Sequence, residues 1–398
     1  MIRDYSIRQK KILLIPEFSE TGGAMTYAIE LMRFYYDSGY KIVVCLPLSC
    51  QLKSMMDKIK LFNIECVTIH ERWRGFKHFW RYSPFNYLLD FILIFKIYKK
   101  IKPDCIVVSN VCPESYLGLA ILSTPFISIQ HTYHLFFKPL NNSNFFVSNL
   151  FFKINNYCLQ KIFNKRTKRI IAVSEFSKKQ FLSSFFLPQE NISVIYNYGL
   201  RKNPFLSVKS QNHKIQILTL AHVRAYKNPL VWIKVAEKVI KFLPEIDVEF
   251  IWCGDGELLE ECKLIVNEIN INEKIKFIGF TKNTQVYYSL ASIYFQPSLI
   301  ESHGISVVEA MAYSLPCVVA DMGGLPESVV NGINGYLVTP DNINEMSQAI
   351  IALINNEKLR KKMGENSLRI YNEKFSYDIW KQKMNDLHNN LFLFKNEF

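Results

Sequence analysis

The chain has no apolar stretch long enough to cross a membrane as a helix. Its 398 residues contain no uninterrupted apolar run of about 18 residues, the length that a spanning helix needs. The nearest candidate, Tyr87 to Phe95, contains Asp90 and is too short. Near the N-terminus, residues 11–16 are too few for the apolar core of a signal peptide. We therefore expect a protein that stays in the cytosol.

Paired cysteines and metal-ligand spacings are also missing. None of the nine cysteines forms a Cys-x-x-Cys pair, and no group of histidines has the spacing of a zinc site. We interpret the cysteines as free thiols, mostly buried, in a reducing compartment. The sequence predicts neither a disulfide framework nor a structural metal.

Negative charge is scarce in the first half of the chain. Residues 1–200 hold 26 Lys and Arg against 13 Asp and Glu, whereas residues 201–398 hold 22 of each. The whole net charge of +13 therefore lies in the first half, which favours an anionic partner there. A length of 398 residues, 49% of them hydrophobic, is typical of two globular domains.

Short apolar runs rich in β-branched residues alternate with helical stretches along the chain. The expected strands are 11–16, 41–46, 64–69, 104–109, 126–130, 169–174 and 192–197, then 214–221, 247–254, 274–280, 292–298, 316–320 and 335–340. This alternation predicts α/β architecture with two doubly wound, Rossmann-like parallel sheets that bind ligands at the carboxyl ends of their strands. We expect domains at 1–198 and 214–374, a linker at 199–213, and a terminal helix in 375–398.

The segment 297–338 is the most informative part of the chain. Glu301 and Glu309 lie eight positions apart around His303 and Gly304, where a loop changes to a helix that begins near Ile305. A glycine there lets a ligand approach the free N–H groups of the first helical turn, where the helix dipole favours anions. Two carboxylates beside such a turn suit a ligand with phosphates and hydroxyls, such as a nucleotide sugar.

The helix itself is marked by its apolar spacing. Ile305, Val308 and Ala312 are three and four residues apart and form one face. Glu309 lies beside that face, where a carboxylate is costly unless a polar group meets it. The spacing alone is equally compatible with a surface Glu301 and a Glu309 that has a protein partner.

The surrounding motifs resemble a known family. EAMA at 309–312, Pro316, GGLPE at 323–327 and NG-x-NG-x-LV at 331–338 keep the register of the Glu-x7-Glu pair. Together they resemble the donor-binding region of GT-B glycosyltransferases, above all the retaining family 4, also called glycosyltransferase group 1. The resemblance covers most of 170–380 and is weaker over 11–135. It implies a GT-B fold, with two Rossmann-like domains facing a central cleft and a last helix that crosses back.

Two cations follow the expected strand at 214–221. Such a pair at a strand end can hold a diphosphate, although alone it is more often a solvated loop. Arg224 and Lys227 are similar to the family's Gly-Arg-x4-Lys segment, which grips the donor diphosphate. Lys227 matches that pattern, but His222 occupies the usual arginine position. Whether His222 or Arg224 has the arginine role stays open.

Other strand ends carry weaker signals. Gly254, in the GDGE turn, matches a family loop near the nucleotide base, and Gly22 with Gly23 matches a glycine pair facing phosphates and acceptor. His131 corresponds to a family histidine near the transferred sugar. Without the resemblance, the glycines are tight turns and the histidine is structural. Ser314 replaces a small or glycine residue, from which we expect little effect, and for Glu327 we expect a structural role.

A basic, aromatic segment at 72–102 interleaves tryptophan, phenylalanine and tyrosine with arginine and lysine, and 151–169 is similar. This composition suits an interface with anionic lipid. The alternative is a core helix with solvated basic ends. No recognised nucleic-acid module occurs, so we expect no nucleic-acid partner.

The resemblance therefore implies a retaining hexosyltransferase, which we expect in the cytoplasm, peripheral at the inner face of the membrane. Its donor would be a UDP- or GDP-linked sugar and its acceptor a lipid-linked or cell-envelope glycan, as in lipopolysaccharide, capsule or exopolysaccharide synthesis. No Asp-x-Asp pair is present to hold a metal, and we expect neither metal nor cofactor. The alternatives are a GT-B sugar-nucleotide epimerase and a non-catalytic sugar-binding subunit. A nicotinamide oxidoreductase fits poorly, because the first turn lacks G-x-G-x-x-G.

Overall fold

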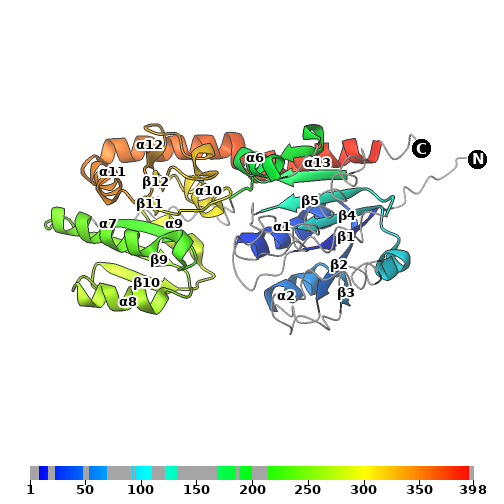
Figure 1. The fold of residues 1–398 in the computed structure, drawn as a ribbon, viewed down its shortest axis with the longest axis horizontal. Helices are drawn as coiled ribbons and strands as arrows, with labels where there is room; N and C mark the ends of the chain where they lie inside the picture. The colour runs from blue at the N-terminus through cyan, green and yellow to red at the C-terminus, as the bar shows by residue number, and fades with distance from the viewer. Residues whose placement is uncertain are drawn as a thin grey trace, which may run out of the picture. The chain divides into compact units, whose positions relative to one another are not determined.

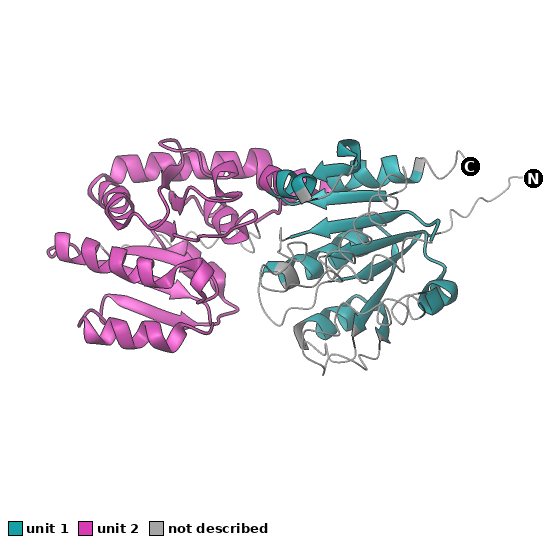
Figure 2. Ribbon diagram, viewed as in Figure 1, with its two compact units in different colours: residues 1–173, 177–195, 383–398 teal, residues 174–176, 196–382 magenta. Residues whose placement is uncertain are grey.

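The computed structural model describes residues 9–16, 23–47, 53–69, 92, 95–109, 122–131, 168–184, 188–199 and 214–393. Most of its helices and strands are labelled in Figure 1. By their internal contacts the residues form two compact units, coloured separately in Figure 2. The first comprises 1–173, 177–195 and 383–398, and the second comprises 174–176 and 196–382.

The first unit is built on a seven-stranded parallel sheet in the order β3-β2-β1-β4-β5-β6-β7. Its strands are β1 (Lys11–Ile15), β2 (Lys41–Pro47), β3 (Glu65–Ile69), β4 (Cys105–Ser109), β5 (Phe126–Gln130), β6 (Lys168–Ala172) and β7 (Ile192–Val194). Its described helices include α1 (Gly23–Asp37), α2 (Lys53–Leu61) and α6 (Glu175–Ser184), although the first two residues of α6 belong by their contacts to the second unit. Strands such as β1 and β4 are buried along nearly their whole length, as a sheet covered on both faces requires.

The second unit contains a six-stranded parallel sheet in the order β10-β9-β8-β11-β12-β13. Its strands are β8 (Ile215–Leu220), β9 (Val248–Cys253), β10 (Ile275–Gly279), β11 (Ile293–Gln296), β12 (Cys317–Ala320) and β13 (Gly335–Val338). Its helices are α7 (Pro229–Phe242), α8 (Leu259–Glu268), α9 (Thr284–Leu290), α10 (Ile305–Ala312), α11 (Ile343–Asn355) and α12 (Glu357–Ile370). The last helix, α13 (Tyr377–Leu393), contains residues of both units.

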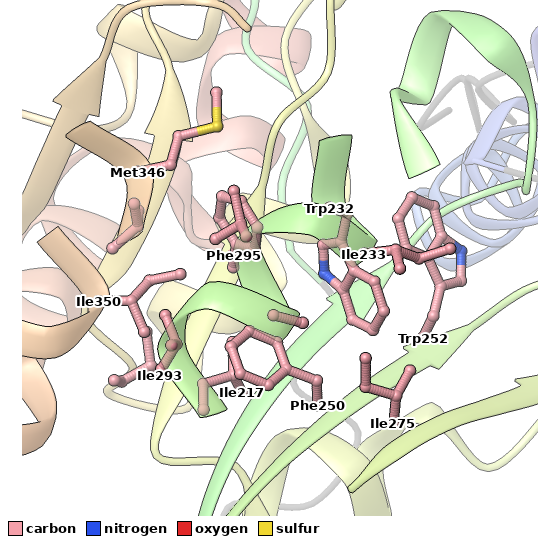
Figure 3. Packing of buried hydrophobic residues seen from close by; sticks show 14 of the residues in the cluster. Ile217, Trp232, Ile233, Phe250, Trp252, Ile275, Ile293, Phe295, Met346 and Ile350 are labelled. Atoms are coloured by element: carbon pink, nitrogen blue, oxygen red, sulfur yellow. The ribbon is translucent and has the colours of Figure 1, made fainter. Parts of the chain in front are cut away.

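Successive side chains on the strands of the second unit point to opposite faces of the sheet and pack in two separate hydrophobic cores. Ile217 and Phe250 lie in one core with helices α7, α8 and α11, shown close up in Figure 3. Trp232 of α7 is fully buried there, with its ring edge-on to Phe250 at 5.6 Å. Leu218 packs in the opposite core with α9 and α10. This alternation holds helices on both faces of the sheet and leaves the strand ends for loops.

Each strand segment expected from the sequence overlaps one of these strands, so the predicted α/β architecture of two parallel sheets is confirmed. The segment 192–197 is paired only as far as Val194. Residues 196–198 and 375–382 belong by their contacts to the second unit, and most of the expected linker lies outside the described residues. Within the described ranges, no helix is long and apolar enough to pass through a bilayer.

Candidate functional site

Two loops of the second unit leave the sheet next to each other. Strands β8 and β11 pair in parallel, with Ile293 opposite Ile217, so the loops that follow them begin side by side. The strand order reverses here, because β9 and β10 lie on one side of this pair and β12 and β13 on the other. In open α/β sheets such a switch point forms a crevice at the carboxyl ends of the strands. The loops after β8 and β11 carry Lys227 and Glu301.

The structure joins these two residues directly. The ammonium of Lys227 forms an ion pair with Oε2 of Glu301, and the two side chains are only 13% and 15% exposed. The loops are also tied by their backbones, since the N–H of Leu299 donates to the carbonyl of Tyr226 at 2.9 Å. A cation and a carboxylate, one on each loop, are thus held together at the switch point.

Arg224 does not join this pair. Its side chain is exposed, and within the described part of the chain it makes no hydrogen bond or ion pair. His222 is half-buried, with Nδ1 3.4 Å from the carbonyl oxygen of Asp255. Lys227 is therefore the cation that the geometry places at the site, and the arginine role stays a prediction.

Glu309 has the polar partner that its position beside an apolar helix face requires. The hydroxyl of Tyr288, on α9, donates to Oε2 of Glu309 at 3.0 Å and also lies 3.1 Å from the carbonyl of Ser306. Burial, followed by the charge of Glu309, raises the pKa of Tyr288 well above its ordinary value. Tyr288 therefore stays a protonated hydroxyl that holds the Glu309 carboxylate. The sequence indicated that a partner was needed but could not identify it.

Helix α10 begins where the sequence predicts. Gly304 is its N-cap, with φ of 85°, and a Cβ there would lie 2.8 Å from the Leu325 side chain. Ile305 is the first helical residue. The first N–H groups of a helix lack intrahelical partners, so the start of α10 can bind an anion.

The side chain of His303 faces away from solvent. It is 1% exposed, and its ring stacks on Tyr196 at 5.1 Å and lies 5.3 Å from Phe375. Burial lowers its pKa to about 3, so the ring is neutral at physiological pH. What His303 can offer a ligand in this conformation is its backbone, and its predicted role stays untested.

Glycines bring two further loops against the site. Gly254 has φ of 150°, and a Cβ on it would lie 1.9 Å from the carbonyl oxygen of Ala221, in the loop after β8. Gly323, with φ of 61°, approaches the carbonyl oxygen of Glu301 so closely that a Cβ would be 2.0 Å away. Gly324 donates its N–H to that carbonyl at 3.0 Å. The GDGE and GGLPE turns thus shape the two loops that carry Lys227 and Glu301.

Glu327 has the structural contacts expected of it. Its carboxylate accepts hydrogen bonds from the backbone N–H groups of Glu175 at 2.8 Å and Phe176 at 2.7 Å, residues of the same unit. A carboxylate in this arrangement satisfies backbone donors.

In the first unit, His131 directly follows β5 and meets the end of the neighbouring strand. Its Nε2 lies 3.0 Å from the hydroxyl of Ser109, the last residue of β4, and its ring is edge-on to Tyr27 at 4.3 Å. Burial lowers the pKa of His131 to about 4, which leaves it neutral at pH 7. Gly23 is the exposed first residue of α1, and Gly22 lies outside the described residues.

Several polar partners of the predicted residues, within each unit, were not predicted from the sequence. Gln296, Tyr294 and Ser306 connect to Glu301 through hydrogen bonds, and Ser109 contacts His131. A signal was present, because a glutamine in the four-residue strand β11, all of it buried, needs partners. Among the described residues no group of three His, Cys, Asp or Glu is arranged to hold a metal ion.

Two family models match consecutive parts of the chain. The model described as "Glycosyltransferase Family 4" matches residues 21–198, and the one described as "Glycosyl transferases group 1" matches residues 203–369. The chain belongs to the group 1 glycosyltransferases and has their GT-B fold. The family recognised from the Glu-x7-Glu region is thereby confirmed.

Individual relatives match the chain only over part of its length and at low identity. An uncharacterised glycosyltransferase of Methanocaldococcus jannaschii is 31% identical over 212 residues, 53% of this chain and 56% of that protein. A poly(ribitol-phosphate) alpha-N-acetylglucosaminyltransferase of Staphylococcus aureus is 25% identical over 253 residues, 63% of this chain and 49% of that protein. The matches thus span about half the length of these curated relatives.

A solved structure shows the same fold over nearly the whole chain. Anabaena HepE, crystallised with UDP and glucose, superimposes with a TM-score of 0.73. It covers 96% of this chain and 100% of its own, at 18% identity. At this identity the likeness concerns the fold alone.

Proposed function

We propose that the protein is a retaining glycosyltransferase that moves a hexose-type sugar from a UDP- or GDP-linked donor to a hydroxyl of a lipid-linked or cell-envelope glycan. The observation that carries this proposal is the gathering of Lys227, Glu301 and the start of α10 at the switch point of the second sheet. Family membership supports the reaction class. The name of the staphylococcal relative supports a cell-envelope acceptor.

Each residue has a role that its surroundings suit. The ammonium of Lys227 and the free N–H groups that follow Gly304 bind the donor diphosphate, with Arg224 or His222 as a second donor. Glu309, held by Tyr288, accepts hydrogen bonds from the ribose hydroxyls. Glu301 orients the sugar. Because departure of the diphosphate is the difficult step, stabilising its growing charge supplies most of the rate enhancement. Positive charge from the chain itself serves this purpose, and the proposal includes no metal.

The first unit is assigned the acceptor. Gly22, Gly23 and His131 are assigned to acceptor binding, with His131 neutral and able to exchange a hydrogen bond through Nε2. Gly254, after β9, is assigned to the surroundings of the nucleotide base. These roles rest on the family resemblance of the motifs.

Reversible attachment to an anionic membrane surface is part of the proposal. Its support is the excess of positive charge in residues 1–200 and the aromatic, basic composition of 72–102, most of which lies outside the described residues. Each lysine or arginine near an anionic bilayer contributes about 1 kcal/mol. Co-sedimentation with vesicles containing phosphatidylglycerol should succeed at low salt and fail at high salt. Equal binding to neutral vesicles would contradict this assignment.

The donor is found by a thermal-shift screen of UDP- and GDP-linked sugars, followed by product analysis with a membrane lipid extract. Lys227→Ala and Glu309→Ala should each lower the transfer rate about 100-fold or more while the protein stays folded. Lys241→Ala is the matched control, because it removes an exposed lysine from an ion pair on α7 of the same unit. Near wild-type rates in either site variant, with the true donor and acceptor, would show that the assigned role is wrong.

The same assays separate the alternatives. An epimerase would release free sugar nucleotide from the donor alone, without an acceptor. A non-catalytic sugar-binding subunit would bind a donor and turn over none of the panel.

A further inference from the structure

A buried polar chain connects strand β11 to the carboxylate of Glu301. Its members are Tyr294, Gln296 and Ser306, and the first two are 0% and 1% exposed. The hydroxyl of Tyr294 donates to Oε1 of Gln296 at 2.7 Å, and the hydroxyl of Ser306 donates to the same oxygen at 3.0 Å. Nε2 of Gln296 then donates to Oε2 of Glu301 at 2.8 Å.

This arrangement fixes which way the Gln296 amide points. With two hydroxyls donating to Oε1, the NH2 group is the end that faces Glu301. The opposite orientation would place an amide oxygen against a carboxylate oxygen, which is repulsive. Because the chain is buried, an amide without partners would cost about 1–3 kcal/mol, so the network holds one geometry.

The consequence for Glu301 is that, among the described residues, one carboxylate oxygen accepts all of the hydrogen bonds to this side chain. Gln296 and Lys227 both donate to Oε2. Among the described residues, Oε1 accepts no hydrogen bond. Two donors from different strand ends, one an amide and one an ammonium, hold the carboxylate so that Oε1 is the oxygen presented to a ligand.

We propose that Gln296 is a positioning residue that, locked by Tyr294 and Ser306, directs Oε1 of Glu301 to a hydroxyl of the donor sugar. This inference rests on the proposed function, because it needs a nucleotide sugar in the site. It adds a specific consequence: Gln296 affects recognition of the sugar and not of the nucleoside diphosphate, since it does not bond to Lys227 and meets the start of α10 only through the side chain of Ser306, not through its backbone N–H groups.

The test compares two ligands, UDP and UDP-glucose, or GDP and GDP-mannose if that pair binds the wild type more tightly, by isothermal titration calorimetry. In Gln296→Leu the nucleotide sugar should bind about tenfold more weakly, the value of one hydrogen bond to a charged group. Affinity for the bare nucleoside diphosphate should stay within about twofold of the wild type. Tyr294→Phe, which frees the amide to rotate, should show the same pattern with a smaller loss.

Gln296→Glu gives a readout that a general packing defect would not give. It has the shape of glutamine but places a second carboxylate beside Glu301, and such pairs share a proton. Its affinity for the nucleotide sugar should recover as the pH falls from about 8 to about 6, while that of the wild type changes little.

Gln216→Leu is the matched control. Nε2 of Gln216 donates to Oε2 of Glu249 at 2.8 Å in the same unit, so this variant breaks an equivalent amide–carboxylate hydrogen bond away from Glu301. Its ratio of the two affinities should equal that of the wild type. Circular dichroism and thermal melting check that each variant is folded, and Gln296→Glu and Tyr294→Phe carry the test if Gln296→Leu is not.

The outcomes are distinct. Equal weakening of both ligands, no change in either, or the same pattern in Gln216→Leu would overturn the role of Gln296 and leave the proposed function intact. A wild-type protein that binds no nucleotide sugar of the panel would overturn the proposed function, and this inference with it.

Discussion

The ion pair between Lys227 and Glu301 predicts that two neutralising substitutions shift nucleotide affinity in opposite directions. In the structure the Lys227 ammonium is paired with the carboxylate of Glu301. A diphosphate that binds Lys227 must share it with this carboxylate and is repelled by the carboxylate's charge. Glu301→Gln should therefore tighten binding of bare UDP, whereas Lys227→Met should weaken it. Both variants should lose sugar transfer.

The size of the change in UDP affinity is set by the repulsion between the Glu301 carboxylate and a diphosphate that binds Lys227. At an effective dielectric constant of about 20, unit charges about 5 Å apart interact by about 3 kcal/mol. The two side chains are 13% and 15% exposed, so solvent and the cost of desolvation remove a large part of that energy. We expect a net gain of about 1–2 kcal/mol in Glu301→Gln, or UDP binding about five- to thirtyfold tighter. Loss of the cation in Lys227→Met should weaken UDP binding by about tenfold or more.

Isothermal titration calorimetry with UDP measures these affinities for the wild type, both single variants and the double variant. Glu301→Gln should tighten UDP less when Lys227 is already Met, because the competition for the ammonium is gone. Glu237→Gln, which removes a carboxylate from an exposed ion pair on α7, is the control and should leave UDP affinity unchanged. Weaker UDP binding in Glu301→Gln would refute the reasoning, since it would mean that Glu301 helps to hold the nucleotide itself.

Three further predictions concern the framework of the second unit. Gly323→Ala places a Cβ against the carbonyl of Glu301 at a φ of 61°. Urea denaturation should therefore show a loss of about 1–3 kcal/mol in the free energy of unfolding, together with weaker UDP-sugar binding. A variant with unaltered stability and binding would contradict the close approach. Ser314 occupies a φ of 60° that suits glycine, so Ser314→Gly should raise the free energy of unfolding by about 0.5–1 kcal/mol, and a destabilised variant would show that the Ser314 side chain matters. Burial alone would raise the pKa of Glu249, but hydrogen bonds from Lys276, Lys214 and Gln216 outweigh it and lower the pKa below its ordinary value of 4.5. Because the pKa of Glu249 is lower in the folded than in the unfolded protein, the wild type should exceed Glu249→Gln in stability by the full amount above about pH 5. This difference in stability should decline as the pH falls below 4.5. A difference that grew in acid would contradict the prediction.

Much of the fold was predictable because its elements are local and periodic. Buried parallel strands consist of short runs of apolar residues, and the segments around 215–220 and 293–296 are recognisable for that reason. Helix α10 was recognisable from the spacing of Ile305, Val308 and Ala312. Ser314 shows what this kind of prediction cannot reach. From its small size we expected little effect of serine in place of glycine, but its backbone has a positive φ, which favours glycine.

The site was predictable as a set of residues but not as a set of contacts. Lys227 and Glu301 were named separately, yet their ion pair depends on β8 and β11 being neighbours, which pairs positions 74 residues apart. The partner of Glu309 could not be read from its own helix, because Tyr288 lies on α9. Side chains that act through such long-range pairs carry no local pattern.

The most direct test of the central claim is a crystal structure of the protein with UDP. The account predicts the diphosphate within hydrogen-bond distance of Nζ of Lys227 and the N–H of Ile305, with the ribose hydroxyls on the carboxylate of Glu309. UDP bound elsewhere on the chain, or Glu309 without contact to the ribose, would contradict it.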